Sequence, residues 1–125
     1  RQAHQDFWPI LDNFGPVKGV LHSFSATKSE LEQAFERGLY IGLNGIMTFS
    51  QEENHREVVR RTPAESLLLE TDAPYLTPKP FRGRICKPEH VLETAKFVAE
   101  QRGAEVEQIA SVTTKNACNL FKIKR

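Results

Sequence analysis

Few of the residues that mark specialised protein classes occur in this sequence of 125 residues. Its two cysteines, Cys86 and Cys118, are too far apart to form a CxxC pair, so we expect neither a zinc knuckle nor a disulfide framework and interpret both as reduced thiols. No apolar run approaches the roughly 18 residues that a membrane span needs, and no basic and apolar leader precedes the first expected helix. We therefore expect a cytoplasmic protein that has no membrane partner.

A large excess of charge of either sign is also missing. Seventeen Lys and Arg residues oppose sixteen Asp and Glu residues, which leaves a formal charge of +1. Because this charge is so small, it indicates no polyanionic partner, and any site for nucleic acid must be local. The sequence is 39% hydrophobic and 26% charged, as in an ordinary folded domain. It begins with Arg1-Gln2-Ala3 rather than Met, and we expect it to be a piece of a longer protein.

Apolar periodicity predicts helices that alternate with short strands. Three short apolar runs are typical of buried strands: residues 17–24, 40–49 and 66–72. Five segments have the periodicity and capping residues of helices: one capped by Asp6, one from Thr27 to Gly38, one around 52–61, one from Pro88 to Gly103 and one around 106–121. The helix after Pro88 is expected to bury an apolar stripe that includes Leu92. Residues 73–87 contain three prolines and one glycine and are expected to form a long, functional loop.

The order of these elements predicts an α/β fold with a parallel sheet. Strands and helices that alternate about every 25 residues form βα units, and parallel strands are buried on both faces. Three strands do not complete such a fold, because a (β/α)₈ barrel needs about 250 residues. Reactive residues in that fold lie at the carboxyl ends of the strands.

Two residues with metal-binding side chains come at expected strand ends. His22 closes the first strand and Asp72 closes the third, so a parallel sheet would place both at one edge. An imidazole and a carboxylate there would supply part of a divalent-metal site, which usually needs three or more protein ligands. The alternative is structural: His22 would be a hydrogen-bonded core histidine, and Asp72 would cap the following turn.

Glu70 is expected on the same strand face as Asp72, because side chains alternate along a strand. One of the two carboxylates could bind a metal while the other orients a ligand or accepts a proton from water. In the alternative interpretation, Glu70 is a buried acid that pairs with a lysine or arginine of a neighbouring strand.

The segment 79–87 (KPFRGRICK) carries four positive charges and no acid. Arg82 and Arg84 could hold a phosphate group through their planar donors, and Phe81 could stack on a base. A solvated loop whose charges only keep the chain in solution is the alternative. The other histidines have no companion ligand in a helical register, and we interpret them as surface or packing residues: His4, His55 and His90.

Taken together, these motifs resemble one family over nearly the whole chain, the TatD family of metal-dependent deoxyribonucleases among the amidohydrolase-like TIM barrels. Five segments carry the resemblance, in this order: VLHSFS at 20–25, GIMTF at 45–49, LLETDAPYLTP at 68–78, RGR at 82–84, and TKN at 114–116 followed by LF at 120–121. The stretch ETDAPYLTP with RGR behind it is the most specific part of this set.

The resemblance implies a partial (β/α)₈ TIM barrel. Residues 1–125 would form the C-terminal part of a single domain, roughly its last three βα units, and the N-terminal half would be absent. The resemblance implies that His22 and Asp72 ligate the metal and that Asp72 is also catalytic, while Glu70 keeps the orienting role inferred above from its strand face. Arg82 and Arg84 would bind the substrate phosphate.

The activity implied by the resemblance is metal-dependent hydrolysis of phosphodiester bonds in DNA, as an exonuclease on single strands. The cofactor would be a divalent ion (Mg²⁺, Mn²⁺ or Zn²⁺), but its site would be incomplete in this chain, so we expect the chain alone to be inactive. Two alternatives remain open: a hydrolase of another ester or amide, such as a D-aminoacyl-tRNA deacylase, and an inert fragment that binds polyanions. The edges of a half-barrel also predict dimerisation.

Overall fold

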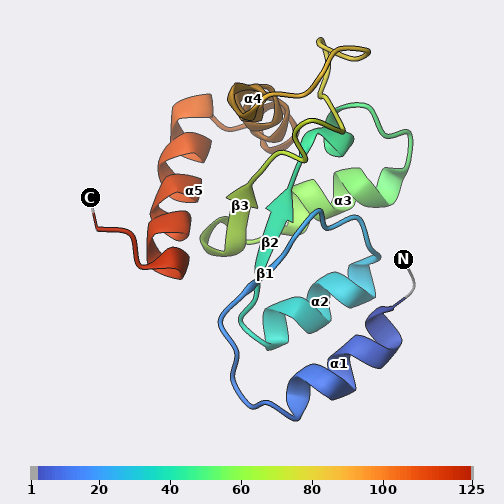
Figure 1. Cartoon of the computed structure of the whole chain (residues 1–125), viewed down its shortest axis with the longest axis vertical. Helices are drawn as coiled ribbons and strands as arrows, with labels where there is room; N and C mark the ends of the chain where they lie inside the picture. Colours follow the sequence, from blue (N-terminus) through green and yellow to red (C-terminus); the bar gives the residue numbers. More distant parts are fainter. Residues whose placement is uncertain (1–2, 125) are drawn as a thin grey trace.

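A three-stranded parallel sheet organises the chain, whose computed structural model describes residues 3–124 (Figure 1). The strands are β1 (Val20–Leu21), β2 (Tyr40–Leu43) and β3 (Leu67–Leu69), and they lie in the order β1-β2-β3. The register pairs Val20 with Tyr40 and Ile41 with Leu67. The predicted parallel sheet of βα units is therefore confirmed.

Helices follow each strand and lie around the sheet. The α-helices in the described residues are α1 (His4–Asp12), α2 (Lys28–Glu36), α3 (Glu53–Arg61), α4 (Val91–Arg102) and α5 (Val106–Phe121). Three short 3₁₀ helices join them: η1 (Gly45–Thr48), η2 (Ala64–Ser66) and η3 (Pro88–His90). Figure 1 shows α1 and α2 beside the β1 side of the sheet, and α4 and α5 beside β3. Within the part of the chain that the structure describes, no helix is both long and apolar enough to span a membrane.

Local sequence signals explain where several helices begin and end. Thr27 caps α2 with a complete capping box, in which its side chain and that of Glu30 each accept a backbone N–H of the other residue. Gly38 after α2 and Gly103 after α4 have φ angles of 66° and 60°, in the left-handed region that favours glycine. The first helix differs from the prediction, because Ala3 rather than Asp6 is its N-cap and Asp6 lies within the first turn.

The strands are shorter than the apolar runs predicted, because polar side chains turn the backbone away from the sheet. After β2, the side chain of Asn44 accepts a hydrogen bond from the amide of Ile46 and starts the 3₁₀ helix η1. After β1, Ser23 has a φ of 53°, which breaks the extended chain. Strand β3 is preceded by the turn η2 and ends at Leu69. Residues 17–24, 40–49 and 66–72 are therefore mostly strand flanks.

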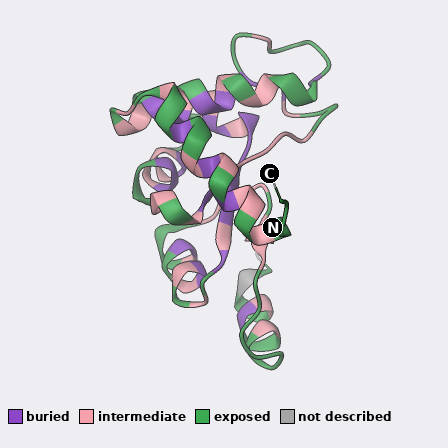
Figure 2. Cartoon of the chain, turned by 90° about the vertical axis from the view of Figure 1, so that its left-hand side faces the viewer, coloured by how far each residue is buried: buried purple, intermediate pink, exposed green. Residues whose placement is uncertain are grey.

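The hydrophobic core lies between the sheet and the helices. Figure 2 shows buried residues along the sheet and on the inward sides of the helices. Six of its residues have no exposed surface: Ala34, Ile41, Leu43, Val59, Leu67 and Val98. The prediction for α4 was wrong at one position, since Leu92 is 50% exposed rather than buried. This packing fixes the relative positions of the strand ends, where the polar side chains gather.

Candidate metal centre

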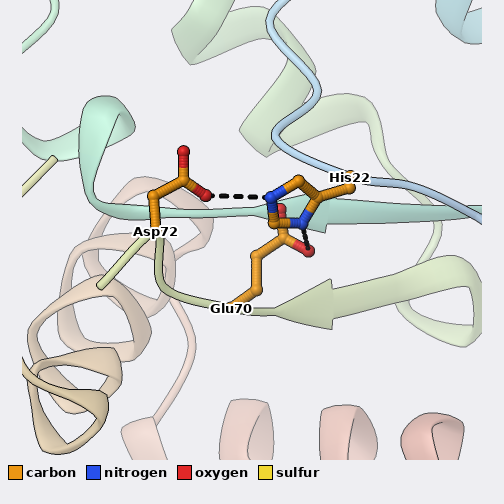
Figure 3. Close-up of side chains that lie close together, drawn as sticks. All are labelled: His22, Glu70 and Asp72. Atoms are coloured by element: carbon orange, nitrogen blue, oxygen red, sulfur yellow. Dashed lines mark ion pairs between the residues drawn. The ribbon is translucent and has the colours of Figure 1, made fainter. Parts of the chain in front are cut away.

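Three ionisable side chains meet at the carboxyl ends of β1 and β3 (Figure 3). His22 directly follows β1, while Glu70 and Asp72 follow β3. The backbone amide of Glu70 still donates to the carbonyl oxygen of Leu43, so the Glu70 side chain is held beside the end of β2. The parallel order of the strands therefore brings together residues that are far apart in the sequence.

The imidazole of His22 lies between the two carboxylates. Its Nδ1 atom is 2.8 Å from Oε2 of Glu70, and its Nε2 atom is 2.9 Å from Oδ1 of Asp72. One ligand atom of each of the three residues lies within 4.8 Å of the others. The His22 side chain is 60% exposed, against 17% for Glu70 and 22% for Asp72. The group is thus open to solvent on the imidazole side and enclosed on the side of the carboxylates.

Burial and mutual charge shift two pKa values in this group. Burial alone would lower the pKa of His22, but the hydrogen bond and charge of Glu70, together with the charge of Asp72, outweigh it and raise that pKa. Burial also raises the pKa of Glu70, and this effect exceeds the opposite effect of its contacts with Ser23 and His22. The two nearby carboxylates therefore favour the charged form of the imidazole.

The turn after β1 is held by a hydrogen-bond network that reaches into the strand ends. The backbone amide of Ser23 donates to Oε1 of Glu70. The Asn44 side chain, which is fully buried, donates from Nδ2 to Oγ of Ser23 at 2.7 Å and accepts from the amide of Ile46 at 3.0 Å. Ser23 is thereby fixed in its left-handed conformation, and His22 is fixed beside Glu70.

Two glycines give the backbone and the acidic side chain room at this edge. A Cβ atom at Gly42 would overlap the carboxylate of Glu70, and one at Gly45 would overlap the carbonyl oxygen of Leu76. Glycine in a strand often marks a close approach of this kind. The loop after Asp72 and the side chain of Glu70 can therefore lie against β2 and η1 only because these positions lack side chains.

The donor set fits a divalent cation. Oδ1 of Asp72 is buried and receives no aligned hydrogen bond, although Nε2 of His22 lies only 2.9 Å away. A buried carboxylate oxygen without an aligned donor costs free energy unless a cation or another donor reaches it. Imidazole nitrogen and carboxylate oxygen are ligands of divalent metals. His22, Glu70 and Asp72 could hold such an ion.

The predicted phosphate-binding arginines lie in the loop 73–87 and not in this group. The guanidinium of Arg82 lies 3.8 Å from the centre of the Phe49 ring, and Nη1 donates to the carbonyl oxygen of Thr77 at 2.9 Å. Arg84 is exposed, and its guanidinium lies 5.8 Å from the ring of Phe81. In Figure 1 the loop lies beyond the carboxyl ends of β2 and β3. Both arginines are exposed, but Arg82 anchors the loop through its contacts with Phe49 and Thr77.

The sequence analysis missed Ser23, Asn44 and Gly42 as members of the network. Ser23 was noted only as part of a motif, and Asn44 lies in an apolar run that suggested a continuous strand. An asparagine followed by glycine inside such a run is a turn signal, and it could have located the end of β2. His55 is buried, with its ring nitrogens 2.6 Å from Oγ of Ser50 and 3.2 Å from the carbonyl oxygen of Ser25. It packs the structure, as predicted.

Comparisons with known proteins point to one family for this chain. The family described as TatD-related DNase matches residues 1–122. The uncharacterized metal-dependent hydrolase YcfH of Escherichia coli K12 is 41% identical over 125 residues, which cover 98% of this chain and 47% of YcfH. The 3′-5′ ssDNA/RNA exonuclease TatD of Citrobacter rodentium is 37% identical over 130 residues, which cover 98% of this chain and 49% of that protein. The chain thus spans about half the length of the curated relatives it matches.

The fold is also that of a solved relative. The crystal structure of YJJV, a TatD homologue from Escherichia coli K12, is 30% identical and superposes with a TM-score of 0.89 over 99% of this chain and 48% of that one. The expected fold, α/β and part of a TIM barrel, is therefore confirmed. Since the family match extends over almost every residue and the fold agrees with it, the chain belongs to the family of TatD-related DNases.

Proposed function

We propose that this chain is part of a metal-dependent hydrolase that cleaves phosphodiester bonds of single-stranded DNA from an end. The observation that carries the proposal is the group His22, Glu70 and Asp72, whose ligand atoms lie within 4.8 Å of one another at the carboxyl edge of a parallel sheet. Reactive residues of βα barrels lie at this edge. The similarity to a protein named as a 3′-5′ ssDNA/RNA exonuclease supports the choice of substrate.

Each residue of the group has a separate part in the proposed reaction. His22 and Asp72 would hold the cation, and the Asp72 carboxylate would accept a proton from the attacking water. Glu70 keeps the His22 ring in place through Nδ1 and keeps the Ser23 amide in place through Oε1. Arg84, which is exposed in the loop, contacts a phosphate of the substrate, while Arg82 holds the loop against Phe49 and adds positive charge.

The proposal includes a divalent cation, Mg²⁺, Mn²⁺ or Zn²⁺. When bound, such an ion lowers the pKa of a bound water and polarises a phosphoryl oxygen. The proposal also includes a cytoplasmic location, which the free thiols of Cys86 and Cys118 support because reduced cysteines persist in reducing compartments.

Degradation of end-labelled single-stranded DNA in the presence of Mg²⁺ or Mn²⁺ tests the proposal. The protein to use is the longest polypeptide that the coding region supplies, with Asp72→Asn as the test variant. Asp6→Asn is the matched control, because Asp6 is an exposed carboxylate on α1. We expect the parent and Asp6→Asn to shorten the DNA from one end and Asp72→Asn to lose the activity.

Other outcomes would change the assignment. An enzyme that leaves DNA intact but releases the amino acid from a charged transfer RNA would be a deacylase on the same fold. DNA binding that persists with EDTA and in Asp72→Asn, without cleavage by the parent, would indicate a polyanion-binding protein. The 125-residue chain by itself is expected to be inactive, because only His22 and Asp72 serve as metal ligands in this proposal, while Glu70, the third member of the group in the described residues, orients His22.

A further inference from the structure

A groove of about 590 Å³ lies beside the loop 73–87 and the start of α4, apart from the group that contains His22. Aromatic, aliphatic and cationic side chains line it together: Phe81, Arg84, Ile85, Lys87, His90 and Leu92. Ile85 is 73% exposed and Leu92 is 50% exposed. Exposed aliphatic side chains that gather in one hollow are typical of binding surfaces.

The aromatic part of the groove is already built. The rings of Phe81 and His90 are stacked, with their centres 4.7 Å apart and their planes at 9°. Nδ1 of His90 also accepts a hydrogen bond from the amide of Lys87 at 3.1 Å, so the imidazole is held in place by η3. A stacked pair of this kind presents flat aromatic surface without any further ordering of the side chains, and flat aromatic surface suits the face of a nucleobase.

The charges around the groove favour a polyanion. The groove also contains Glu89 and Glu93, but Glu89 lies 3.6 Å from Nζ of Lys87, and Glu93 lies 2.8 Å from Nζ of Lys96. Among residues 3–124, no carboxylate pairs with Arg84, which is exposed. A cation that pairs with no carboxylate and lies beside stacked rings matches a ligand that combines apolar faces with negative charge.

The groove is connected to the candidate metal centre through the loop backbone. The amide of Cys86 donates to the carbonyl oxygen of Pro74 at 3.0 Å, and the amide of Tyr75 donates to the carbonyl oxygen of Asp72. Pro74 is two residues after Asp72, so their Cα atoms lie within about 8 Å of each other. The side chains that flank Cys86 in sequence, Ile85 and Lys87, both line the groove. A nucleic acid strand that is bound at Asp72 therefore has only a short distance to span before it reaches the groove.

We propose that this groove binds an unpaired base of the single-stranded nucleic acid substrate, with Arg84 on a neighbouring phosphate. The inference rests on the proposed function, because it assigns the groove to the same substrate. The base stacks against the Phe81–His90 pair and contacts Ile85 and Leu92. Base stacking on aromatic residues tolerates any sequence, since every base has an aromatic face. The groove therefore adds affinity for single strands and not for a particular sequence.

Binding in EDTA tests the groove separately from catalysis. The probes are a fluorescently labelled oligothymidylate and an oligomer of the same length made of abasic sugar phosphates, and anisotropy measures their affinity for the protein. We expect the parent protein to bind the oligothymidylate at least about fivefold more tightly than the abasic oligomer, which is the lower range for stacking of one base. Equal affinity for the two probes, or no binding of either, would overturn the proposal.

Variants at exposed positions locate the preference for bases. The double variant Ile85→Gln/Leu92→Gln should lower this preference, because it removes the aliphatic contacts with the base and leaves the Phe81–His90 rings in place. The control Ile10→Gln, which alters a residue of α1 that is 56% exposed, should keep the preference. Arg84→Gln should weaken binding of both oligomers by the same factor, whereas Lys18→Gln should not. A double variant that keeps the full preference for bases would contradict the proposal. Urea denaturation verifies that each variant is folded.

A second measurement needs no variant. Stacking of a base on the Phe81–His90 pair should move the proton resonances of the His90 ring in the NMR spectrum when oligothymidylate is added, and the abasic oligomer should move them less. Unmoved resonances at saturating oligothymidylate would overturn the proposal. These binding experiments contain no metal, so their result is independent of the nuclease assay with Mg²⁺ or Mn²⁺. Base-dependent binding by a protein that shows no nuclease activity in that assay would refute the proposed function and leave the groove assigned. Nuclease activity in a protein that shows no base-dependent binding would support the proposed function and refute the assignment of the groove.

Discussion

The carboxylate of Glu70 lies so close to the α-carbon of Gly42 that a Cβ atom at position 42 would overlap it. The same carboxylate contacts Nδ1 of His22 and the backbone amide of Ser23. Glycine weakens a strand because it has no side chain to pack, so its presence in β2 needs a reason. The reason is that Gly42 provides the space in which Glu70 reaches the turn after β1.

Gly42→Ala should therefore displace Glu70 and loosen His22 while the sheet remains intact, since the obstructing atoms end a flexible side chain. We expect metal affinity about 10- to 100-fold weaker, which is the usual effect of losing a residue that orients a ligand. Calorimetric titration of the longest available polypeptide with Mn²⁺ measures it. Gly19→Ala is the control, because a Cβ there would lie 3.8 Å from its nearest neighbour, in Leu39. Equal affinities of the two variants would contradict this role of Gly42.

Asn116→Ala should destabilise the fold rather than the metal centre. The buried side chain of Asn116 in α5 donates from Nδ2 to the carbonyl oxygens of Ala64 and Leu67, at 2.7 and 2.8 Å. Removing it leaves two carbonyl oxygens without this donor, and we expect the free energy of unfolding to fall by about 2–4 kcal/mol. Urea denaturation followed by circular dichroism measures the change. Asn119→Ala, at an exposed position of the same helix, should change it by less than about 0.5 kcal/mol.

The fold was predictable because its signals are local or periodic. The Thr27 capping box, Gly38 and Gly103 set helix ends that the structure reproduces. Strand lengths were overestimated, since apolar runs show burial but do not show where pairing ends. At Asn44 the end of pairing depends on side-chain hydrogen bonds to Ser23 and Ile46, and the bond to Ser23 joins residues 21 positions apart.

The candidate site was predictable in composition but not in detail. Parallel strands place His22 and Asp72 at one edge, so their proximity follows from the order of elements. The position of Glu70 against Gly42 does not follow, because it depends on the register of β2 and β3, which pairs Gly42 with Leu68. The stacking of Phe81 on His90 was also missed, because the irregular loop has no periodicity from which its path could be read.

Stability should depend on Asp12 in acid. Arg37 donates from Nε and Nη2 to the two carboxylate oxygens of Asp12, each at 2.7 Å, and this joins the ends of α1 and α2. These hydrogen bonds lower the pKa of Asp12 below its ordinary value of 3.8. Because the folded-state pKa is the lower one, ionised Asp12 stabilises the fold above pH 3.8, and this contribution is lost as the pH falls through the folded-state pKa.

Urea midpoints measured from neutral pH to below pH 3.8 check this expectation. Asp12→Asn should be less stable than the parent at neutral pH, and the difference should shrink in acid as Asp12 becomes protonated. Asp6→Asn on the same helix should show no comparable change in its difference from the parent. A gap between Asp12→Asn and the parent that stays constant over the whole range would show that the ion pair does not contribute through its charge.

The 125-residue chain purified by itself should self-associate. In residues 3–124, β1 and β3 each pair with β2 alone, so both outer edges of the sheet carry unpaired backbone groups. The segment that leads into β1 also exposes apolar side chains, with Phe14 at 77% and Val17 at 37%. Light scattering should give a mass above 14.2 kDa that rises with concentration. Val17→Lys should lower it, because charge at an edge opposes strand pairing, while Ile10→Lys on α1 should not. A monomer at every concentration would show that the edges are protected within the chain itself.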